Sequence, residues 1–166
     1  MKKTLDLVVR ADAIIYEVGR KGKRPISIDS TKLYNNIRDI AGDVVDLIQS
    51  SIGKTGFDRI APAVERAIPT ASAVAWVMEK PLIFIQRDKL SLVGLMVPGN
   101  VVLPIDDIIG SDDKPTTVVN SIVASGGLVR DYVCLLDEDR AGSAALRNMG
   151  IRTHSLLHLS DLPTVT

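Results

Sequence analysis

The sequence contains one cysteine, few aromatic residues and no excess of either charge. Because Cys134 is alone, an internal disulfide and a cysteine-based zinc site are excluded, and a reducing, cytoplasmic setting is favoured. Aromatic residues make up only 4% of the chain, too few for a platform that stacks single-stranded nucleic acid. Lysine plus arginine number 20, as do aspartate plus glutamate, so no net positive charge indicates nucleic acid or a membrane surface as a partner.

Long apolar runs are also absent. No stretch reaches the roughly 18 apolar residues that a membrane helix needs. Charged Lys2, Lys3 and Asp6 interrupt the start of the chain, so we expect no signal peptide there. Of the 166 residues, 46% are hydrophobic, which is enough to bury a core. Since no repeat or linker is visible, we predict a single domain over residues 1–166.

Hydrophobic periodicity divides this domain into an N-terminal helical hood, residues 1–52, and an α/β core, residues 53–166. Apolar residues at helical spacing predict one helix over residues 3–18 and a second that ends at about residue 50. Asp29 or Ser30 can cap the start of the second helix. Residues 25–28 are expected to be extended. In the core, short apolar runs at 59–64, 81–85, 101–105, 132–136 and 151–159 alternate with helical segments at 69–78, 115–125 and 141–149. This alternation predicts a doubly wound, mostly parallel sheet.

The segment richest in chemistry joins a buried strand to a helix N-terminus. Asp106 and Asp107 directly follow the apolar run 101–105, and a loop from Gly110 leads to a helix whose first turn holds Pro115. Two adjacent carboxylates at an exposed strand end suit vicinal ribose hydroxyls, because each carboxylate accepts two O–H bonds. Backbone N–H groups before a helix suit a phosphate. We therefore expect a ligand at the carboxyl ends of the strands.

Four segments carry a resemblance to a known family. They are residues 101–109, 22–29, 63–71 and 150–162. In these segments the sequence resembles the type I phosphoribosyltransferases, and most closely the orotate phosphoribosyltransferases. The similarity runs in one order from about residue 3 to residue 162, which is more specific than any single motif.

The resemblance implies transfer of ribose 5-phosphate from phosphoribosyl pyrophosphate to orotate or a related base, in pyrimidine nucleotide metabolism. It implies Mg²⁺ bound through the pyrophosphate, and a homodimer. By position, Asp106 and Asp107 would hold ribose hydroxyls, and Arg87 and Lys89 would supply catalytic cations. The residues implied to bind substrate are Glu65, Arg66, Gly110, Ser111, Lys114, Thr116, Thr117 and Arg140.

The ligand loops depart from the family pattern. Asp112 and Asp113 add acids to the phosphate loop, and each would oppose a phosphate dianion by about 1 kcal/mol or more. Gln86 stands where an arginine is expected, in a catalytic loop that is short and apolar. Glu138 stands at the position where the family has an arginine that helps to hold the orotate carboxylate, and Arg140 follows two residues later.

A further departure is Ala67, whose Cβ replaces a glycine in the loop expected to approach the pyrophosphate. Together these differences leave three functions open. The first is an active phosphoribosyltransferase. The second is a catalytically impaired paralogue that senses a nucleotide or phosphoribosyl pyrophosphate. The third is a structural remnant that binds no phosphoribosyl compound.

Other conspicuous residues have simpler interpretations. His154 and His158 lie in an extended segment without a paired carboxylate motif, so we do not expect them to bind a metal. Trp76 and Met78 are expected in the core. The apolar run 90–97 would be an aggregation liability if exposed, so we expect it to be covered, for example by a second subunit.

Overall fold

Four parallel strands form the centre of the molecule, as the alternating pattern predicted. The structure is a computed structural model that describes residues 2–19, 22–86 and 91–165. The strands are β3 (Arg59–Pro62), β6 (Val102–Ile109), β7 (Asp131–Asp137) and β8 (Arg152–His158), and they lie side by side in the order β3-β6-β7-β8. Every residue of β7 is buried, because a central parallel strand is covered on both faces.

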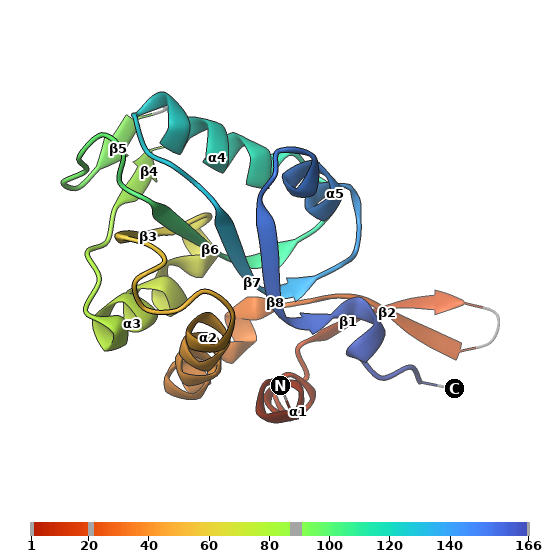
Figure 1. Ribbon diagram of the computed structural model, residues 1–166. Helices are drawn as coiled ribbons and strands as arrows, with labels where there is room; N and C mark the ends of the chain where they lie inside the picture. The colour runs from red at the N-terminus through yellow and green to blue at the C-terminus, as the bar shows by residue number, and fades with distance from the viewer. Residues whose placement is uncertain (1, 20–21, 87–90, 166) are drawn as a thin grey trace.

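Helices cover both faces of this sheet (Figure 1). One face packs against α1 (Lys2–Arg10), α2 (Ile37–Ser51) and α3 (Ile68–Met78), and the other against α4 (Lys114–Ala124) and α5 (Ala141–Asn148). Two hydrophobic clusters result, one on each side of the sheet. Among the described residues, no helix is long and apolar enough to cross a membrane.

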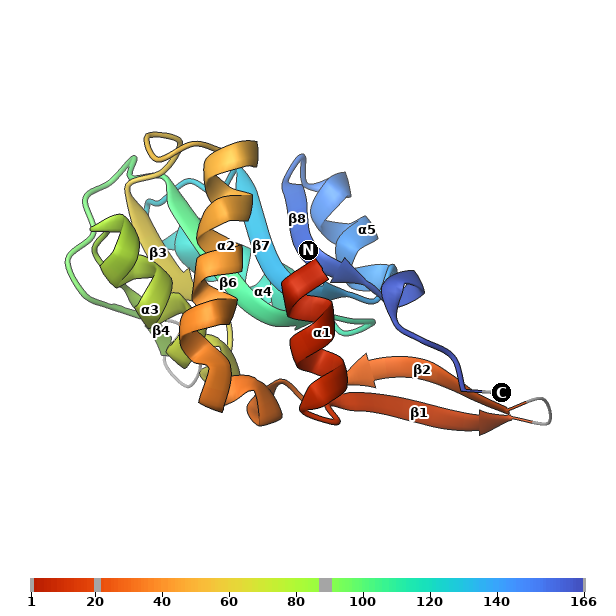
Figure 2. The ribbon, with the colours of Figure 1, turned by 90° about the horizontal axis from the view of Figure 1, so that it is seen from below.

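The predicted helix over residues 3–18 is wrong. Helix α1 ends at Arg10, and β1 (Ile14–Gly19) pairs antiparallel with β2 (Gly22–Ile28) in a hairpin that extends away from the body (Figure 2). Asp12 ends the helix in a left-handed conformation with φ 49°, and the Ala13 N–H donates to the Val8 carbonyl. The β-branched and aromatic residues that follow favour a strand.

The second predicted helix is divided in two. Residues Ser30–Asn36 form a 3₁₀ helix, η1, and α2 follows directly. Asp29 caps η1, because its carboxylate accepts the Thr31 N–H at 3.1 Å. The predicted extended piece at 25–28 is the second half of β2.

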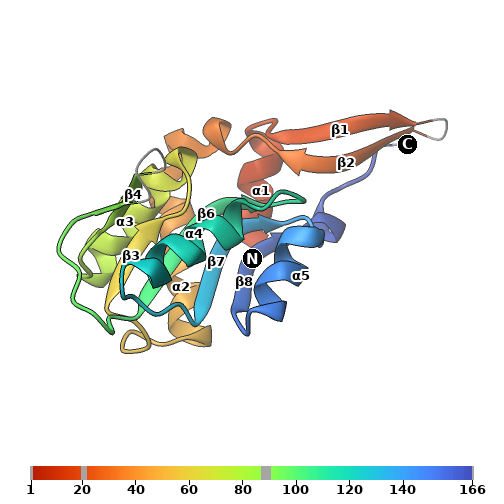
Figure 3. The same ribbon diagram turned by 90° about the horizontal axis from the view of Figure 1, so that it is seen from above.

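The remaining short elements complete the edges. The predicted strand at 81–85 is mostly irregular: Leu82 makes a single parallel bridge with Ile60, and β4 (Phe84–Gln86) pairs with β5 (Ser91–Val93) in a separate two-stranded sheet. Short 3₁₀ helices lie at η2 (Glu65–Ala67) and η3 (Leu159–Asp161). Figure 3 shows α4 and α5 next to each other on one face of the sheet, where α4 packs on β6 and α5 packs on β8.

Candidate phosphoribosyl site

The two predicted carboxylates lie inside β6 and not at an exposed strand end. Asp106 and Asp107 are each only 2% exposed. The expectation of an exposed end is wrong because Ile108 and Ile109 continue the strand by pairing with Leu136 and Asp137 of β7. Successive side chains of a strand point to opposite faces, so the two carboxylates have different partners.

The Asp107 carboxylate is held from the N-terminal side of the molecule. The Ser30 hydroxyl of η1 donates to its Oδ2 at 2.6 Å, and Nε of Arg66 in η2 lies 3.0 Å from the same oxygen. The Tyr34 hydroxyl donates to the Arg66 carbonyl at 3.0 Å and fixes η2 in place. Asp107 is thus charge-paired and oriented before any ligand arrives.

The Asp106 carboxyl points to the other face of the sheet. The Tyr132 hydroxyl of β7 donates to its Oδ2 at 2.8 Å. Burial, with the neighbouring Asp107 carboxylate as a second cause, raises the pKa of Asp106 to about 8. Burial also raises the pKa of Tyr132. Burial in this position therefore favours the neutral acid form of Asp106.

A cavity of about 220 Å³ lies at the carboxyl ends of β3, β6 and β7, where parallel sheets bind ligands. Asp107 lines it, and Asp106 does not. Ser27 of β2 and Val64 also contribute, so the N-terminal hairpin forms part of the wall. The full lining is Ser27, Val64, Arg66, Asp107, Ile108, Gly110, Ser111, Asp112, Lys114 and Glu138.

The loop between β6 and α4 forms one wall of this cavity. Helix α4 begins at Lys114 with Pro115 in its first turn, as predicted. The ammonium of Lys114 makes an ion pair with Asp112, an acid of its own loop. The hydroxyls of Thr116 and Thr117 donate to the Asp113 carbonyl at 2.8 and 3.1 Å. These two predicted substrate residues thus stabilise the start of α4 and are not part of the cavity lining.

The start of α5 fixes the same loop from behind. The Gly142 N–H donates to the Gly110 carbonyl at 2.9 Å. A Cβ at Gly142 would lie 2.6 Å from that oxygen, so only glycine permits this approach.

Glu138 follows β7 and borders the loop. Its Oε2 lies 3.4 Å from Nε of Arg140, whose side chain is 44% exposed. Glu138 lines the cavity, whereas Arg140 does not. At this wall the structure therefore presents an acid, with its cation on the solvent side.

The other predicted residues are distributed around the cavity. Glu65 is exposed at the start of η2. Ala67 is buried, and its methyl group is not part of the cavity wall. Arg87 and Lys89 lie outside the described residues. Sequence reasoning missed the role of Tyr132, for which a residue inside an apolar strand gives no signal. It considered Ser30 only as a helix cap, a task that Asp29 performs.

The two histidines each have an acidic partner. His154 Nε2 lies 2.8 Å from Asp131, and His158 Nδ1 lies 3.2 Å from Asp139. Within the described part of the chain, one group has metal-ligand spacing: Asp137, Asp139 and His158. The Asp137 carboxylate already accepts hydrogen bonds from the Ser143 hydroxyl and the Asp139 N–H.

The sequence matches no protein-family model. It is 26% identical over 174 residues to an orotate phosphoribosyltransferase of Archaeoglobus fulgidus, with 94% of this chain and 93% of the relative covered. It is 25% identical over 147 residues to a bifunctional enzyme PyrF/PyrE of Nostoc, with 85% of this chain covered. This chain spans only 31% of that bifunctional protein.

Solved structures share the fold. The UMP synthase of Leishmania donovani has a TM-score of 0.81 and 24% identity, covering 96% of this chain and 36% of that one. An orotate phosphoribosyltransferase of Mycobacterium tuberculosis, in complex with phosphoribosyl pyrophosphate, has a TM-score of 0.71 and 20% identity, covering 96% of both chains. The chain has the α/β fold of the type I phosphoribosyltransferases. Within that class it is a divergent relative of the orotate phosphoribosyltransferases, which confirms the resemblance found in its sequence.

Proposed function

We propose that the protein transfers ribose 5-phosphate from phosphoribosyl pyrophosphate to a nucleobase of pyrimidine metabolism, orotate or a related base. The observation that carries the proposal is the shared cavity of Asp107 and the loop Gly110–Lys114. A carboxylate accepts hydrogen bonds from the hydroxyls of a ribose, and a loop before a helix offers backbone N–H groups to the phosphate of the same sugar. Both kinds of group meet at the carboxyl end of β6.

The proposed transfer exchanges one bond at the ribose for another. The bond from C1 of the ribose to the pyrophosphate oxygen breaks, and pyrophosphate leaves with the electron pair. A ring nitrogen of the base forms a bond to C1 and loses its proton to solvent. Because the transition state resembles an oxocarbenium ion, the protein acts chiefly by positioning and by electrostatic stabilisation.

The residues divide these tasks. The Asp107 carboxylate, oriented by Ser30, accepts hydrogen bonds from the ribose hydroxyls. Arg66 lies beside it with a half-exposed side chain and faces the leaving group in this proposal. Lys114 neutralises the 5′-phosphate after separating from Asp112. Arg87 and Lys89 remain the proposed source of further cations.

Mg²⁺ belongs to the same proposal as a companion of the pyrophosphate. The carboxylate oxygens of Asp107 and Asp112 line the cavity and are the hard ligands that this ion prefers, so the residues present fit it. When bound, the ion neutralises the negative charge of the leaving pyrophosphate.

A homodimer is the proposed assembly, and its proposed surface is the exposed side of α3. The segment Ile68–Met78 contains no charged residue, and a helix that is apolar all round is normally covered. Yet Trp76 is 84% exposed, so the expectation that it belongs to the core is wrong, whereas Met78 is buried as expected.

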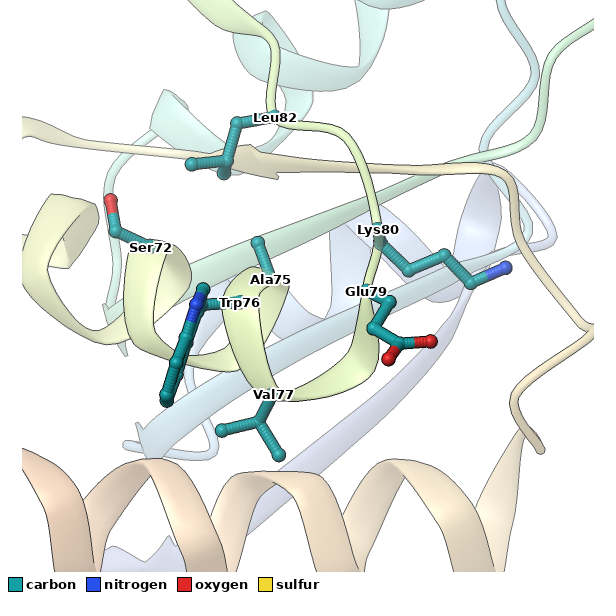
Figure 4. A pocket seen from close by; sticks show the side chains of 7 residues that line it. All are labelled: Ser72, Ala75, Trp76, Val77, Glu79, Lys80 and Leu82. Carbon is teal, nitrogen blue, oxygen red and sulfur yellow. The ribbon is translucent and has the colours of Figure 1, made fainter.

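A groove adjoins Trp76, and the apolar Val77 and Leu82 line it together with the charged Glu79 and Lys80 (Figure 4). Leu95 and Val97, from the apolar run that we expected to be covered, are also exposed. We place this dimer in the cytoplasm, the compartment that the single buried Cys134 favours.

The substitution Asp107→Asn tests the proposed function. It removes the charge that Arg66 and the ribose hydroxyls require, so we expect the affinity for phosphoribosyl pyrophosphate with Mg²⁺ to fall at least tenfold in calorimetry. Asp6→Asn, an exposed change on α1, is the matched control. Equal affinity in Asp107→Asn and the control would show that the ligand does not meet Asp107.

A second candidate function is sensing without turnover, and the ion pair between Asp112 and Lys114 favours it. Because Lys114 is already neutralised, an incoming phosphate must compete with an acid of the same loop. The two functions separate in one experiment. A sensor binds phosphoribosyl pyrophosphate but consumes no base at high protein concentration, whereas the enzyme releases pyrophosphate in proportion to the base consumed.

A further inference from the structure

The Asp107 carboxylate has little capacity left to accept hydrogen bonds. Its Oδ2 accepts from the Ser30 hydroxyl at 2.6 Å and lies 3.0 Å from Nε of Arg66. Its Oδ1 accepts from the Ile108 N–H at 3.0 Å. A carboxylate has about four acceptor sites, so these three donors leave about one. Two neighbouring ribose hydroxyls need two sites, and one of the three donors must therefore leave before both hydroxyls can bind.

Arg66 is the donor that can leave at the lowest cost. Ser30 is only 3% exposed, and the Ile108 N–H belongs to the backbone of β6. The Arg66 side chain is 57% exposed, so it can turn away from Asp107 without becoming a buried, unpaired cation. Its ion pair uses Nε, and the four terminal N–H donors of the guanidinium are not needed for that contact.

The backbone around Arg66 is fixed, so its side chain can move alone. The Tyr34 hydroxyl donates to the Arg66 carbonyl at 3.0 Å, and the Ala67 N–H donates to the Val64 carbonyl at 3.0 Å. Arg66 and Asp107 both line the cavity of about 220 Å³. An anion in this cavity therefore lies within the reach of the same guanidinium that occupies Asp107.

We infer that the ion pair between Arg66 and Asp107 is a latch that an anion opens, and that its opening couples the two halves of the ligand. This inference rests on the proposed function and specifies how that same site is regulated. An entering pyrophosphate competes with Asp107 for Arg66, because a guanidinium pairs bidentately with phosphate oxygens. When Arg66 turns to the pyrophosphate, Oδ2 of Asp107 regains an acceptor site for a ribose hydroxyl. Pyrophosphate and ribose 5-phosphate groups therefore bind cooperatively.

The experiment titrates a ribose phosphate that cannot react. The probe is 1,4-anhydroribitol 5-phosphate, which keeps the 2- and 3-hydroxyls and the phosphate but carries nothing at C1. Calorimetry measures its affinity with and without saturating inorganic pyrophosphate, always at one Mg²⁺ concentration. We expect pyrophosphate to tighten binding of the probe at least about fivefold, and the probe to tighten binding of pyrophosphate by the same factor. The 2,3-dideoxy analogue of the probe has no hydroxyls to place on Asp107 and should show no coupling.

Two variants remove the competition for Asp107 in different ways. Arg66→Ala removes the latch, so we expect the coupling factor to fall to about one. Arg147→Ala, an exposed change in the last turn of α5, is the matched control and keeps the wild-type coupling. Ser30→Ala removes another donor from the same oxygen and leaves Arg66 in place. Both hydroxyls then fit without opening the latch, and the coupling should fall as well. This second variant decides the matter if Arg66→Ala does not fold or does not bind the probe.

Three results overturn the inference alone: independent binding of pyrophosphate and probe in the wild type, equal coupling with the dideoxy analogue, or wild-type coupling in either variant. The last would mean that the coupling runs through Mg²⁺ and pyrophosphate and not through Arg66. Phosphoribosyl pyrophosphate with Mg²⁺ is titrated in parallel. If it does not bind, the proposed function fails and the inference fails with it.

Discussion

Asp106 and Asp107 are sequence neighbours in different chemical environments. Asp107 has a cation and a hydroxyl donor beside a cavity, whereas Asp106 has a tyrosine hydroxyl inside a hydrophobic cluster. The alternation of a strand is sufficient to separate them. The pair of acids predicted a ligand site from sequence, but only the structure shows that one of the two lines the cavity.

The raised pKa of Asp106 predicts a pH dependence of stability. The folded state binds a proton at this residue up to about pH 8, whereas the unfolded chain releases it near the ordinary aspartate pKa of 3.8. The stabilisation is therefore fully present below about pH 4 and is lost as the pH rises through about 8. In Asp106→Asn we expect the free energy of unfolding to fall less with pH over this window, by up to about 1.4 kcal/mol per pH unit.

Urea denaturation at pH 5, 6, 7 and 8 measures this difference between wild type and variant. Asp6→Asn serves again as the control, because Asp6 is exposed on α1. Parallel pH profiles for the wild type and Asp106→Asn would contradict a neutral Asp106 in the folded state.

The ion pair of Asp112 predicts the effect of removing its charge. In Asp112→Asn, Lys114 is free to meet a phosphate, so we expect inorganic phosphate, titrated without Mg²⁺, to bind several-fold more tightly at low salt. Calorimetry at two salt concentrations checks this, with the exposed Asp6→Asn on α1 as control. An unchanged affinity would mean that Lys114 does not contact the phosphate.

At the scale of elements, α5 closely approaches the loop after β6 that forms one wall of the cavity. The contact depends on Gly142, which has no side chain to separate the helix from the Gly110 carbonyl. The same loop carries the ion pair and one wall of the cavity. Geometry at the site therefore depends on packing behind it.

Two glycine substitutions form a matched pair that tests this dependence. Gly142→Ala should cost about 1–3 kcal/mol of stability and weaken phosphate binding, because its Cβ would clash with a backbone oxygen. Gly42→Ala in α2 meets nothing within 4 Å and should stabilise the protein by about 0.5–1 kcal/mol through helix propensity. Thermal denaturation measures both, and a neutral Gly142→Ala would contradict the proposed packing.

Elements of the core could be predicted because their signals are strong and local. The strands at 132–136 and 151–159 and the helices at 69–78, 115–125 and 141–149 agree with the structure within a few residues. The N-terminal hairpin could not be predicted, because the apolar residues within 14–18 continue a spacing that also fits a helix. Only the left-handed Asp12 and the pairing with β2 decide between these structures.

At the scale of the whole molecule, α3 presents an apolar surface that a single chain leaves exposed. Helix α3 has the composition of a buried helix, and this is why its sequence predicts a core position for Trp76. Sequence indicates that such a helix is covered, but not by what. The proposed homodimer supplies the cover.

A substitution on this surface tests the assembly. Trp76→Ser should weaken self-association at least tenfold and leave the folded monomer intact, because the side chain is largely exposed. Sedimentation velocity over a range of concentrations measures the change. Val123→Ser, an exposed apolar residue of α4, is the control. A monomeric wild-type protein would refute the dimer, and an unaffected dimer in Trp76→Ser would place its surface elsewhere.

The hairpin and the C-terminal tail are joined by a short pairing. Val165 exchanges two backbone hydrogen bonds with Lys23, so β2 has a neighbour on either side. The opposite margin of the hairpin belongs to β1, where the charged Glu17 discourages another strand from adding. The tail thus covers the outer edge of β2. Removing the last few residues would leave this edge unpaired, and its backbone N–H and C=O groups could then pair with a strand of another molecule.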